Sequence, residues 1–422
     1  MILQGYIGIE NVDHSAFITQ GVVFMLYVGI DVAKYKHDLA VIDNEGEIFI
    51  RHLQIANNRE GFTQLQMTLE NLRVSTGQSI QIALEDTGHY SFNILRFLRS
   101  NGYPTFSYNP FLIKEFAKSQ SLRKTKTDKK DAMTIARKLR DDVGKTLFDA
   151  DTIMIELKYA TRNVNRLKQD CTKQKIHYVR LLDILFPELL PALGGKNGHH
   201  NRYIYEMIKV FPSPEKLATA HLTKLTNILS NSSRGKVGKE DALKLKKLAS
   251  SSIGQSSPAL EFELLQTIDL IQHLTNLRDA ANKEVEQLMK EIDSPLLSVP
   301  GIGVKLGAVI LAEIRSIHNF KTPAQLLAFA GSEPSISTSG ENQTENGHMV
   351  KRGSSQLRWA LHEAARLCAI WSPSMKTYYQ KKRDEGKHYN VAISHVVKKL
   401  VRIIFRILKT GEPYEEDKMV VN

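Results

Sequence analysis

Cysteine is scarce in this chain of 422 residues, which contains only Cys171 and Cys368. Two cysteines so far apart exclude a disulfide scaffold and a cysteine-rich zinc site, and they are typical of a reducing cytoplasm. No apolar run reaches the roughly 20 residues that span a bilayer, so we expect no membrane partner. The chain also lacks the basic start and cleavage site of a signal peptide, and it lacks the Gly-rich Walker loop of ATP-driven enzymes.

Acidic residues are the minority charge. Lys and Arg together number 57 against 45 for Asp and Glu, which gives a formal net charge of +12 and a pI near 9.4. This surplus favours a polyanionic partner such as nucleic acid. At this length the chain is expected to hold two or three domains.

Four of the carboxylates stand where they could meet. Asp31 and Glu85 each end an apolar, strand-like run, while Asp128 and Asp131 lie three residues apart at the start of a helix-like stretch. Residues three apart share a helix face, so two strand ends and one helix face could form an acidic pocket. Magnesium takes oxygen ligands of this kind. Each residue alone is more often simply solvated, but together, in a basic chain, they predict a metal-dependent nuclease fold.

The first 150 residues alternate between strand and helix patterns, which predicts an α/β domain at 25–150. The first strand is nearly continuously apolar and is expected to be central. Residues 1–24 are interpreted as an upstream extension or a misassigned start. Strands are expected at 26–30, 38–42, 47–54, 80–84 and near 104–107, and helices at 90–100, 110–120 and 129–140.

Beyond residue 150 the pattern becomes helical. Apolar residues between Leu157 and Leu185 approximate a heptad seam, and a second seam runs from Leu264 to Ile292. This spacing predicts a coiled-coil region at 151–293, although two helices packed on a globular core fit the pattern equally well. Residues 190–257, rich in Gly, Ser and Lys, are expected to be an inserted module of short helices.

The turn Pro300-Gly301-Ile302-Gly303 separates an apolar helix end from another helix-like run, the pattern of a helix-hairpin-helix. Its glycines permit close backbone approach, and the amides that follow can bind phosphate oxygens. We therefore expect Gly301, Gly303 and Lys305 to contact nucleic acid. A plain turn between two core helices is the alternative.

A compound pattern follows downstream. An apolar turn at 327–334 precedes the pair Ser339-Gly340, and a polar loop then leads to Lys351-Arg352-Gly353, Arg358 and an Ala-rich helical run. Further on, residues 376–383 mix aromatic rings with cations, a composition that suits phosphate contact and base stacking. Lys351, Arg352, Arg358, Lys381 and Lys382 are the expected nucleic-acid contacts, against the commoner reading of solvated helix faces.

With these motifs the chain resembles the DEDD-type insertion-sequence transposases, relatives of the pilin-gene invertase that act as bridge-RNA-guided serine recombinases. The resemblance runs from about residue 25 to residue 413. It rests on Tyr-Val-Gly-Ile-Asp at 27–31, Lys-Thr-Asp-Lys-Lys-Asp-Ala at 126–132, Pro-Gly-Ile-Gly at 300–303 and Lys-Thr-Gly-Glu-Pro at 409–413.

The resemblance implies a RuvC-like domain of RNase H fold at 25–150, a mostly α-helical C-terminal transposase domain at 294–413 and a tail at 414–422. It implies that Ser339 attacks a DNA phosphate and forms a phosphoserine link. The implied partners are donor and target DNA, a guide RNA and further copies of the chain in a dimer or tetramer, in a prokaryotic cytoplasm near the nucleoid. The implied ligands of Mg²⁺ or Mn²⁺ are Asp31, Glu85, Asp128 and Asp131.

Elementary chemistry leaves the choice of hydroxyl open. A serine needs a base or a metal to become a nucleophile, and no histidine stands beside Ser339 in the sequence. A magnesium ion held by the four carboxylates could activate it, which would couple the two motifs. Ser332, Ser335 and Ser337 are local alternatives that only the family position argues against. Two other functions also fit: a RuvC-like endonuclease that uses water, and a non-catalytic DNA-binding protein.

Overall fold

The computed structural model describes residues 24–85, 88–108, 110–120, 128–142, 152–193, 198–333, 338–339, 342–343 and 349–416. Within it the chain divides into two units, residues 1–149 and 150–422, each with its own core. The extension predicted at residues 1–24 lies outside the described residues except for Phe24, and so does the tail from residue 417 onward.

A mixed five-stranded sheet forms the centre of the first unit. Its order is β3 (Ile48–Ala56), β2 (Lys36–Ile42), β1 (Met25–Val32), β4 (Ser79–Glu85) and β5 (Thr105–Tyr108). β2 pairs antiparallel with both β3 and β1, whereas β4 runs parallel to β1 and to β5. The strand predicted to be central is central: Leu26, Val28 and Ile30 are buried on one of its faces, and Gly29 is buried on the other.

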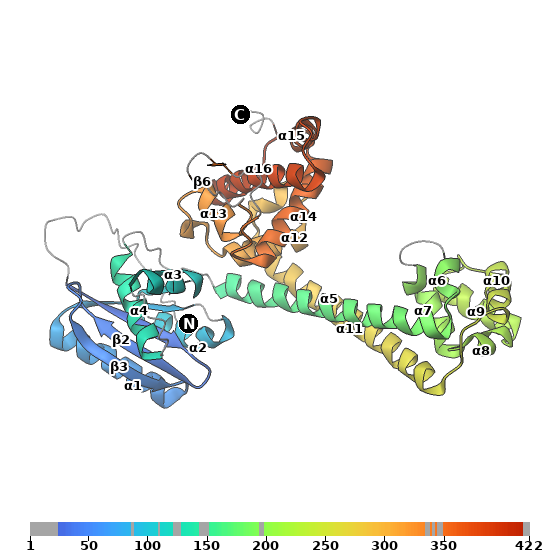
Figure 1. Ribbon diagram of the computed structural model, residues 1–422, viewed down its shortest axis with the longest axis horizontal. Helices are drawn as coiled ribbons and strands as arrows, with labels where there is room; N and C mark the ends of the chain where they lie inside the picture. Colours follow the sequence, from blue (N-terminus) through green and yellow to red (C-terminus); the bar gives the residue numbers. More distant parts are fainter. Residues whose placement is uncertain are drawn as a thin grey trace, which may run out of the picture. The chain divides into compact units, whose positions relative to one another are not determined.

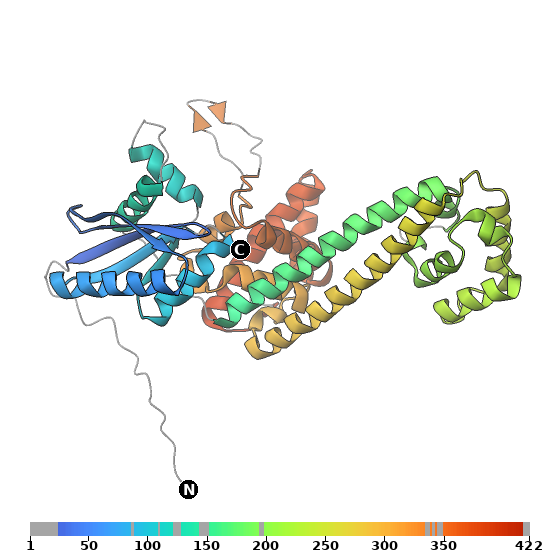
Figure 2. The same ribbon diagram turned by 90° about the horizontal axis from the view of Figure 1, so that it is seen from below.

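Helices cover both faces of this sheet (Figure 2). On one face, Leu26, Val28 and Ile30 pack with residues of α1 (Arg59–Thr76) and α2 (Ser91–Ser100), which follows the short helix η1 (Gly88–Tyr90). On the other face lie α3 (Pro110–Gln120) and α4 (Asp128–Asp141). An α/β N-terminal domain is therefore confirmed.

Helix α1 has no counterpart among the predicted elements, although its ends carry clear signals. The side chain of Asn58 accepts a hydrogen bond from the amide of Gly61 at 2.8 Å, which caps the helix start. At the other end Gly77 adopts φ 67° and donates its amide to the carbonyl of Arg73. Leu65 and Leu69 are buried in the core, and Phe62 and Leu72 pack against it from the same helix.

Gly29 brings α4 into backbone contact with β1. A Cβ atom at this position would lie 2.1 Å from the carbonyl oxygen of Ala132 and 2.3 Å from the amide nitrogen of Ala136. Such distances are shorter than any contact between these atoms, so a side chain here would push the helix off the sheet. The glycine fixes how closely the start of α4 approaches the end of β1.

We expect Gly29→Ala to destabilise the first unit by about 1–3 kcal/mol, the usual cost of overpacking. Hydrogen exchange should rise in β1 and α4, which mass spectrometry of the intact chain would localise. The matched control is Gly238→Ser, since a Cβ at Gly238 meets nothing within 4 Å and serine is a favoured N-cap. Unchanged exchange in both elements would contradict the close packing.

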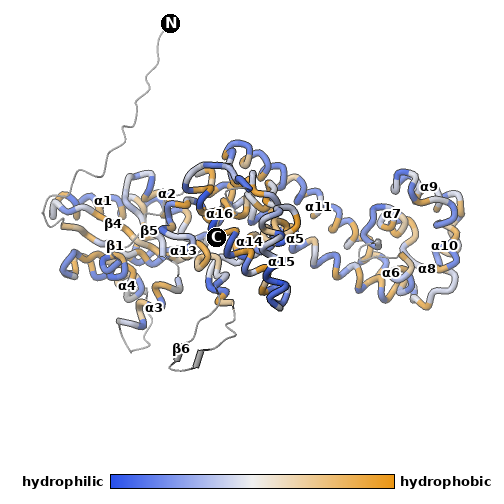
Figure 3. The backbone as a smooth tube through the Cα atoms, turned by 90° about the horizontal axis from the view of Figure 1, so that it is seen from above, coloured by the Kyte–Doolittle hydropathy of each residue, from blue (hydrophilic) through white to orange (hydrophobic). Residues whose placement is uncertain are grey.

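The second unit is built on two long helices, α5 (Thr152–Leu185) and α11 (Pro258–Ile292), which pack against each other (Figures 1 and 2). His177 of α5 contacts Glu263, and Cys171 contacts Thr275, so the two helices run antiparallel. Polar and apolar stretches alternate along both of them (Figure 3). The long helices predicted from the two seams are present; the coiled-coil geometry itself stays a prediction.

Short helices, as expected for 190–257, close the far end of this pair around a separate core. They are α6 (Leu189–Ala192), η2 (Gly198–His200), α7 (Arg202–Val210), α8 (Pro214–Ala218), α9 (Leu222–Ser233) and α10 (Lys239–Ser250). Their core includes Tyr178, which is fully buried, and the pKa of its hydroxyl is raised by that burial.

The other end of the pair carries the C-terminal helices, which share one core with the base of α5 and α11. The long helices α14 (Ser355–Trp371) and α16 (Tyr389–Thr410) contact each other in this core. No helix in the described part of the chain is both long and apolar enough to cross a membrane. The elements are η3 (Pro295–Ser298), α12 (Val304–Ile314), η4 (Ile317–Asn319), α13 (Pro323–Phe329), α14 (Ser355–Trp371), α15 (Pro373–Asp384) and α16 (Tyr389–Thr410).

Candidate functional site

Two of the predicted carboxylates stand at one edge of the sheet. Asp31 and Glu85 follow the paired residues Ile30 and Leu84 on the parallel strands β1 and β4. Residues in register on neighbouring strands point to the same face, so Asp31 and Glu85 share the face that α4 covers. Both are half-buried. The parallel pairing therefore brings together two acids that are 54 positions apart in the sequence.

Helix α4 adds Asp131 to this edge. Its residues Ala132 and Ala136 touch Gly29, two positions before Asp31. Its other end lies beside Tyr27. Burial raises the pKa of the Tyr27 hydroxyl, and the charge of Arg140 partly offsets that increase. The helix therefore runs antiparallel to β1, and its first turn points toward Asp31. Asp131 is half-buried in that turn.

Asp128 is the first residue of α4, but its side chain lies outside the described residues. Among the side chains that are described, no group of three His, Cys, Asp or Glu residues is placed to hold a metal ion. Asp31, Glu85 and Asp131 nevertheless supply the all-oxygen donors that Mg²⁺ and Mn²⁺ prefer, and the backbone directs them to one end of the sheet. The donor chemistry fits a hard cation, and the metal itself stays a prediction.

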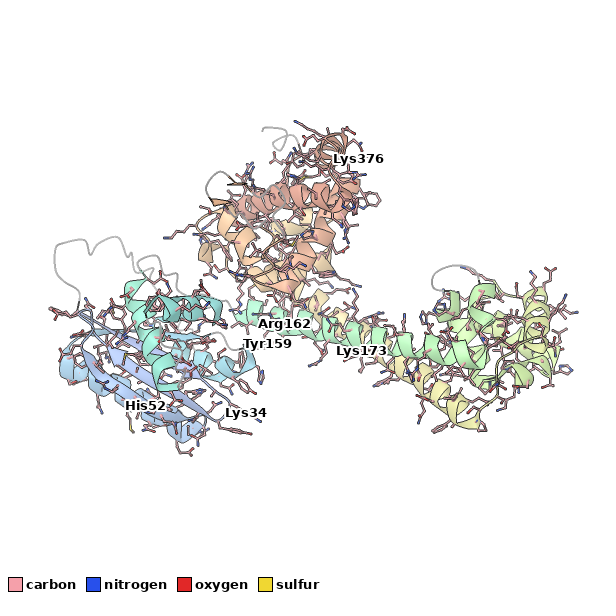
Figure 4. The ribbon with its side chains drawn as sticks, viewed as in Figure 1. Lys34, His52, Tyr159, Arg162, Lys173 and Lys376 are labelled. Carbon is pink, nitrogen blue, oxygen red and sulfur yellow. The ribbon has the colours of Figure 1, made fainter. Side chains whose placement is uncertain are left out.

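A fifth carboxylate, Asp38, was not singled out from the sequence as a site residue. It pairs directly across from Asp31 in the β1–β2 ladder and is 2% exposed. Its Oδ1 lies 2.5 Å from Nε2 of His52 on β3 (Figure 4), and it accepts a hydrogen bond from Nε2 of Gln54 at 3.3 Å. Asp38 is therefore a buried acid, fixed by His52 and Gln54, that lies beside the predicted metal ligands.

Ser339 belongs to a short ribbon in the second unit. It lies in β6 (Thr338–Ser339), which pairs antiparallel with β7 (Asn342–Gln343), so that Ser339 faces Asn342 in the ladder. The side chain of Ser339 lies outside the described residues, as do Ser335 and Ser337. Of the four serines considered, only Ser332 has a described side chain, and its Oγ is buried without a hydrogen-bond partner.

The two ends of the segment that carries Ser339 are fastened to each other. The amide of Val350 donates to the carbonyl of Glu333 at 2.9 Å, and the amide of Lys351 donates to Gly331 at 3.1 Å. Lys351 itself adopts φ 53°, in the left-handed region. These bonds close the base of the segment 332–350 and fasten its two ends to each other.

Two glycines make this base possible. A Cβ on Gly353 would lie 2.2 Å from the carbonyl oxygen of Phe329, and one on Gly331 would lie 2.8 Å from that of Arg352. Both glycines adopt positive φ. The backbone near Gly331 and the backbone near Gly353 therefore approach so closely that both positions require glycine.

A buried carboxylate ties this base to the rest of the unit. Glu313 of α12 is 5% exposed and accepts hydrogen bonds from Nε and Nη2 of Arg162 on α5 at 3.1 and 3.0 Å. It also accepts one from Oγ of Ser354 at 2.8 Å, and that oxygen caps α14 through the amide of Leu357. Arg162 lies on the part of α5 next to the C-terminal helices (Figure 4). One ion pair thus links three helices where the serine segment closes.

The Pro-Gly-Ile-Gly turn divides into a packed half and an open half. A Cβ on Gly301 would lie 2.7 Å from the amide of Cys368, so this residue accommodates α14. Gly303 and Lys305 are exposed at the start of α12, and nothing lies within 4 Å of a Cβ on Gly303. The predicted helix before the turn is only the short 3-10 helix η3. Contact with nucleic acid through this turn stays a prediction.

The remaining residues predicted to contact nucleic acid differ in whether their side chains already bond to other groups of the protein. Lys351, Arg352 and Lys381 are exposed. Arg358 instead donates from Nη1 to the carbonyl of Ala330 at 2.9 Å and so stabilises the base of the serine segment. Lys382 is paired with Glu385 at 2.8 Å, and the hydrogen bond between them raises the pKa of the lysine.

Comparison with known families places both parts of this arrangement in transposases. A DEDD-type model described as Transposase, of the IS110 kind, matches residues 28–187, and a model described as Transposase IS116/IS110/IS902 family matches residues 293–380. The first span contains the four predicted metal ligands, and the second contains Ser339. Neither match includes the helical module at 198–250.

Individual relatives extend the similarity over most of the chain. The mini-circle IS117 protein of Streptomyces coelicolor is 28% identical over 93% of this chain and 96% of its own length. The pilin gene-inverting protein of Moraxella bovis is 22% identical over 92% of this chain and 98% of its own. The transposase for insertion sequence element IS1111A of Coxiella burnetii is 24% identical over 92% and 90%, respectively.

Proposed function

Because this chain belongs to the IS116/IS110/IS902 family of transposases, we propose that it is the DNA recombinase of a mobile insertion sequence and acts through a 5′-phosphoserine intermediate on Ser339. The observation that supports this most directly is the closed base of residues 332–350. It fastens both ends of the segment that carries the ribbon with Ser339, which limits how far the proposed nucleophile can stray. The similarity to a pilin gene-inverting protein favours strand exchange as the outcome.

The proposed chemistry is a transesterification. The Oγ–H bond of Ser339 breaks, a new bond joins Oγ to the DNA phosphorus, and the bond from phosphorus to the 3′ oxygen breaks. The 3′ oxygen leaves as a hydroxyl after it takes up a proton. Attack by the 3′-hydroxyl of another strand then restores the phosphodiester and frees the serine. Each step exchanges one phosphate ester for another, so no ATP is needed.

The carboxylate edge of the first unit is proposed to be the metal site of a RuvC-like domain. Asp31, Glu85, Asp128 and Asp131 would hold Mg²⁺ or Mn²⁺, and Asp38 would keep the strand edge in place through His52. A bound divalent cation would offset the charge that develops on the attacked phosphate. A guide RNA that directs target choice and assembly into a dimer or tetramer complete the proposal.

Trapping tests the function as a whole. Purified protein incubated with DNA carrying the element ends, then denatured, should leave a protein–DNA adduct that survives in a denaturing gel. An endonuclease that uses water would yield nicked DNA without an adduct. A non-catalytic binding protein would yield neither product, so each of the three functions gives its own result.

Nucleic-acid affinity is expected to fall steeply with salt. A protein with a net charge of +12 would bind phosphates through Lys and Arg and release their counterions, and added salt opposes that release. With six to ten phosphate contacts the loss between 50 and 200 mM salt would be about 10³- to 10⁵-fold. Lys381→Gln should lower the slope of log K against log salt by about 1. Lys283→Gln, at an exposed position of α11, is the charge-matched control. Affinity that ignores salt would show that the positive charge is incidental.

A further inference from the structure

A cavity of about 580 Å³ opens beside the base of the serine segment. Its walls come from three places: α13, the exposed side of α16 and the residues that flank the segment at either end. Ser332 and Glu333 stand at one end of the segment 332–350 and Met349 at the other, so the cavity meets the segment that carries Ser339 at its base. Its volume lies within the roughly 300–1,000 Å³ of sites that hold small ligands.

Two cationic side chains on one side of the cavity are available to bind a ligand. Lys398 and Arg402 lie four residues apart on the exposed face of α16, and both line the cavity. Within the described part of the chain neither side chain makes a hydrogen bond or ion pair, although Glu333 lines the same cavity. Two neighbouring cations without a protein partner suit a ligand that carries an anionic phosphate.

The part of the cavity between α13 and the first turns of α16 suits an unstacked base. Leu327 and Val391 offer apolar surface, and Asn390 adds an amide that can both donate and accept hydrogen bonds. Burial and the nearby lysines lower the pKa of His395, so its imidazole is neutral at pH 7 and can take either role. Apolar walls with a few polar groups, joined to a phosphate-binding end, match the parts of one nucleotide.

We propose that this cavity holds one unstacked deoxynucleotide of the strand that Ser339 attacks, with its phosphate on Lys398 and Arg402 and its base between α13 and Val391. The inference rests on the proposed function, because the occupant is taken to be DNA only on account of the adjoining serine segment. A nucleotide seated there would hold the strand in register at the base of the segment that carries Ser339.

Photocrosslinking tests the occupant locally. A photoreactive p-benzoylphenylalanine replaces Val391, which is 46% exposed, in the full-length protein, and the control carries the same group at Ile370, which is 61% exposed on α14. The probe is a labelled 16-mer of thymidylate, with the uridylate 16-mer as competitor. We expect a crosslink from position 391 and none from 370. Equal crosslinking from both positions, no crosslink, or preferential loss to the RNA competitor would overturn the proposal.

Substitutions separate the two halves of the site. Lys398→Gln with Arg402→Gln should weaken the crosslink about 10-fold, since charge-assisted contacts to phosphate are lost, whereas Arg406→Gln, one turn further along α16, should not. Ala324→Trp should fill the cavity and block the crosslink, while Ala328→Trp, which lies outside the lining, should leave it intact. An undiminished crosslink in the double variant and in Ala324→Trp would contradict the site.

The two proposals fail differently. If the wild-type protein forms a Ser339 adduct but position 391 never crosslinks, the cavity assignment is wrong and the function stands. If position 391 crosslinks to DNA and no adduct forms on any serine, the cavity binds DNA and the phosphoserine chemistry is wrong.

Discussion

Replacing Ser339 by alanine is expected to abolish both the covalent protein–DNA adduct and the recombinant product. The substitution removes one oxygen, the atom proposed to bond to phosphorus. A water molecule that attacked instead would hydrolyse the DNA and leave no phosphate ester for strand exchange. Loss of a covalent nucleophile usually lowers the rate by more than about 10³-fold. Because the ribbon is held by backbone pairing of Ser339 with Asn342, the fold and the affinity for DNA should persist.

Denaturing gels of a stalled reaction and peptide mapping of the adduct would locate the link. Ser337→Ala, two positions earlier, is the matched control and should keep full activity. Recombination by Ser339→Ala at the wild-type rate would show that the chemistry is wrong. An adduct mapped to Ser332, Ser335 or Ser337 would show that the chemistry is right and the residue is not.

Much of the first unit could be predicted from sequence because its central strands β1 and β4 are nearly continuous apolar runs. The runs that end at Asp31 and Glu85 lie in β1 and β4, where the apolar pattern placed them. Helix α1 was missed although Phe62, Leu65, Leu69 and Leu72 face the core at helical spacing. Its capping residues, Asn58 and Gly77, were the better guide, since they act through local hydrogen bonds.

Site residues could be predicted where a local sequence pattern marks them. They were missed where their position depends on pairing between distant parts of the chain. Asp38 lies opposite Asp31 only because β1 and β2 form an antiparallel ladder, a register that neither strand states alone. The bond from Lys351 to Gly331 likewise joins residues 20 apart across a segment with no periodic pattern. The glycines at 331 and 353 were the available signal, because both need a positive φ.

The same distinction explains the mixed outcome for the basic residues. Lys382 and Arg358 read from sequence as free cations, yet one pairs with Glu385 and the other bonds to the carbonyl of Ala330. Lys398 and Arg402 were not among the residues predicted to contact nucleic acid, although both lie on α16, whose apolar stripe packs into the core. The opposite face of that helix lines the cavity. Composition counts charges, but only packing shows which of them stay available.

The second large effect is expected for Asp31→Asn, which should lower DNA cleavage about 100-fold or more. The change is isosteric, so the strand and its contact with α4 should survive, but one ligand charge is lost. A loss of about 3 kcal/mol of transition-state stabilisation corresponds to that factor. Asp131→Asn should behave alike, because it removes a carboxylate from the same edge of the sheet. Cleavage rates measured against magnesium concentration would show the defect.

A readout without DNA makes the assignment firmer. Mg²⁺ or Mn²⁺ should raise the melting temperature of the wild-type protein, since a ligand at 100 times its Kd stabilises by about 2.7 kcal/mol. That increase should be lost in Asp31→Asn and kept in Glu60→Gln, which removes an equal charge from an exposed position in the first turn of α1. Normal cleavage by Asp31→Asn with an unchanged metal-dependent melting shift would sink the metal site. A lost shift with normal cleavage would leave a metal site that strand cleavage does not need.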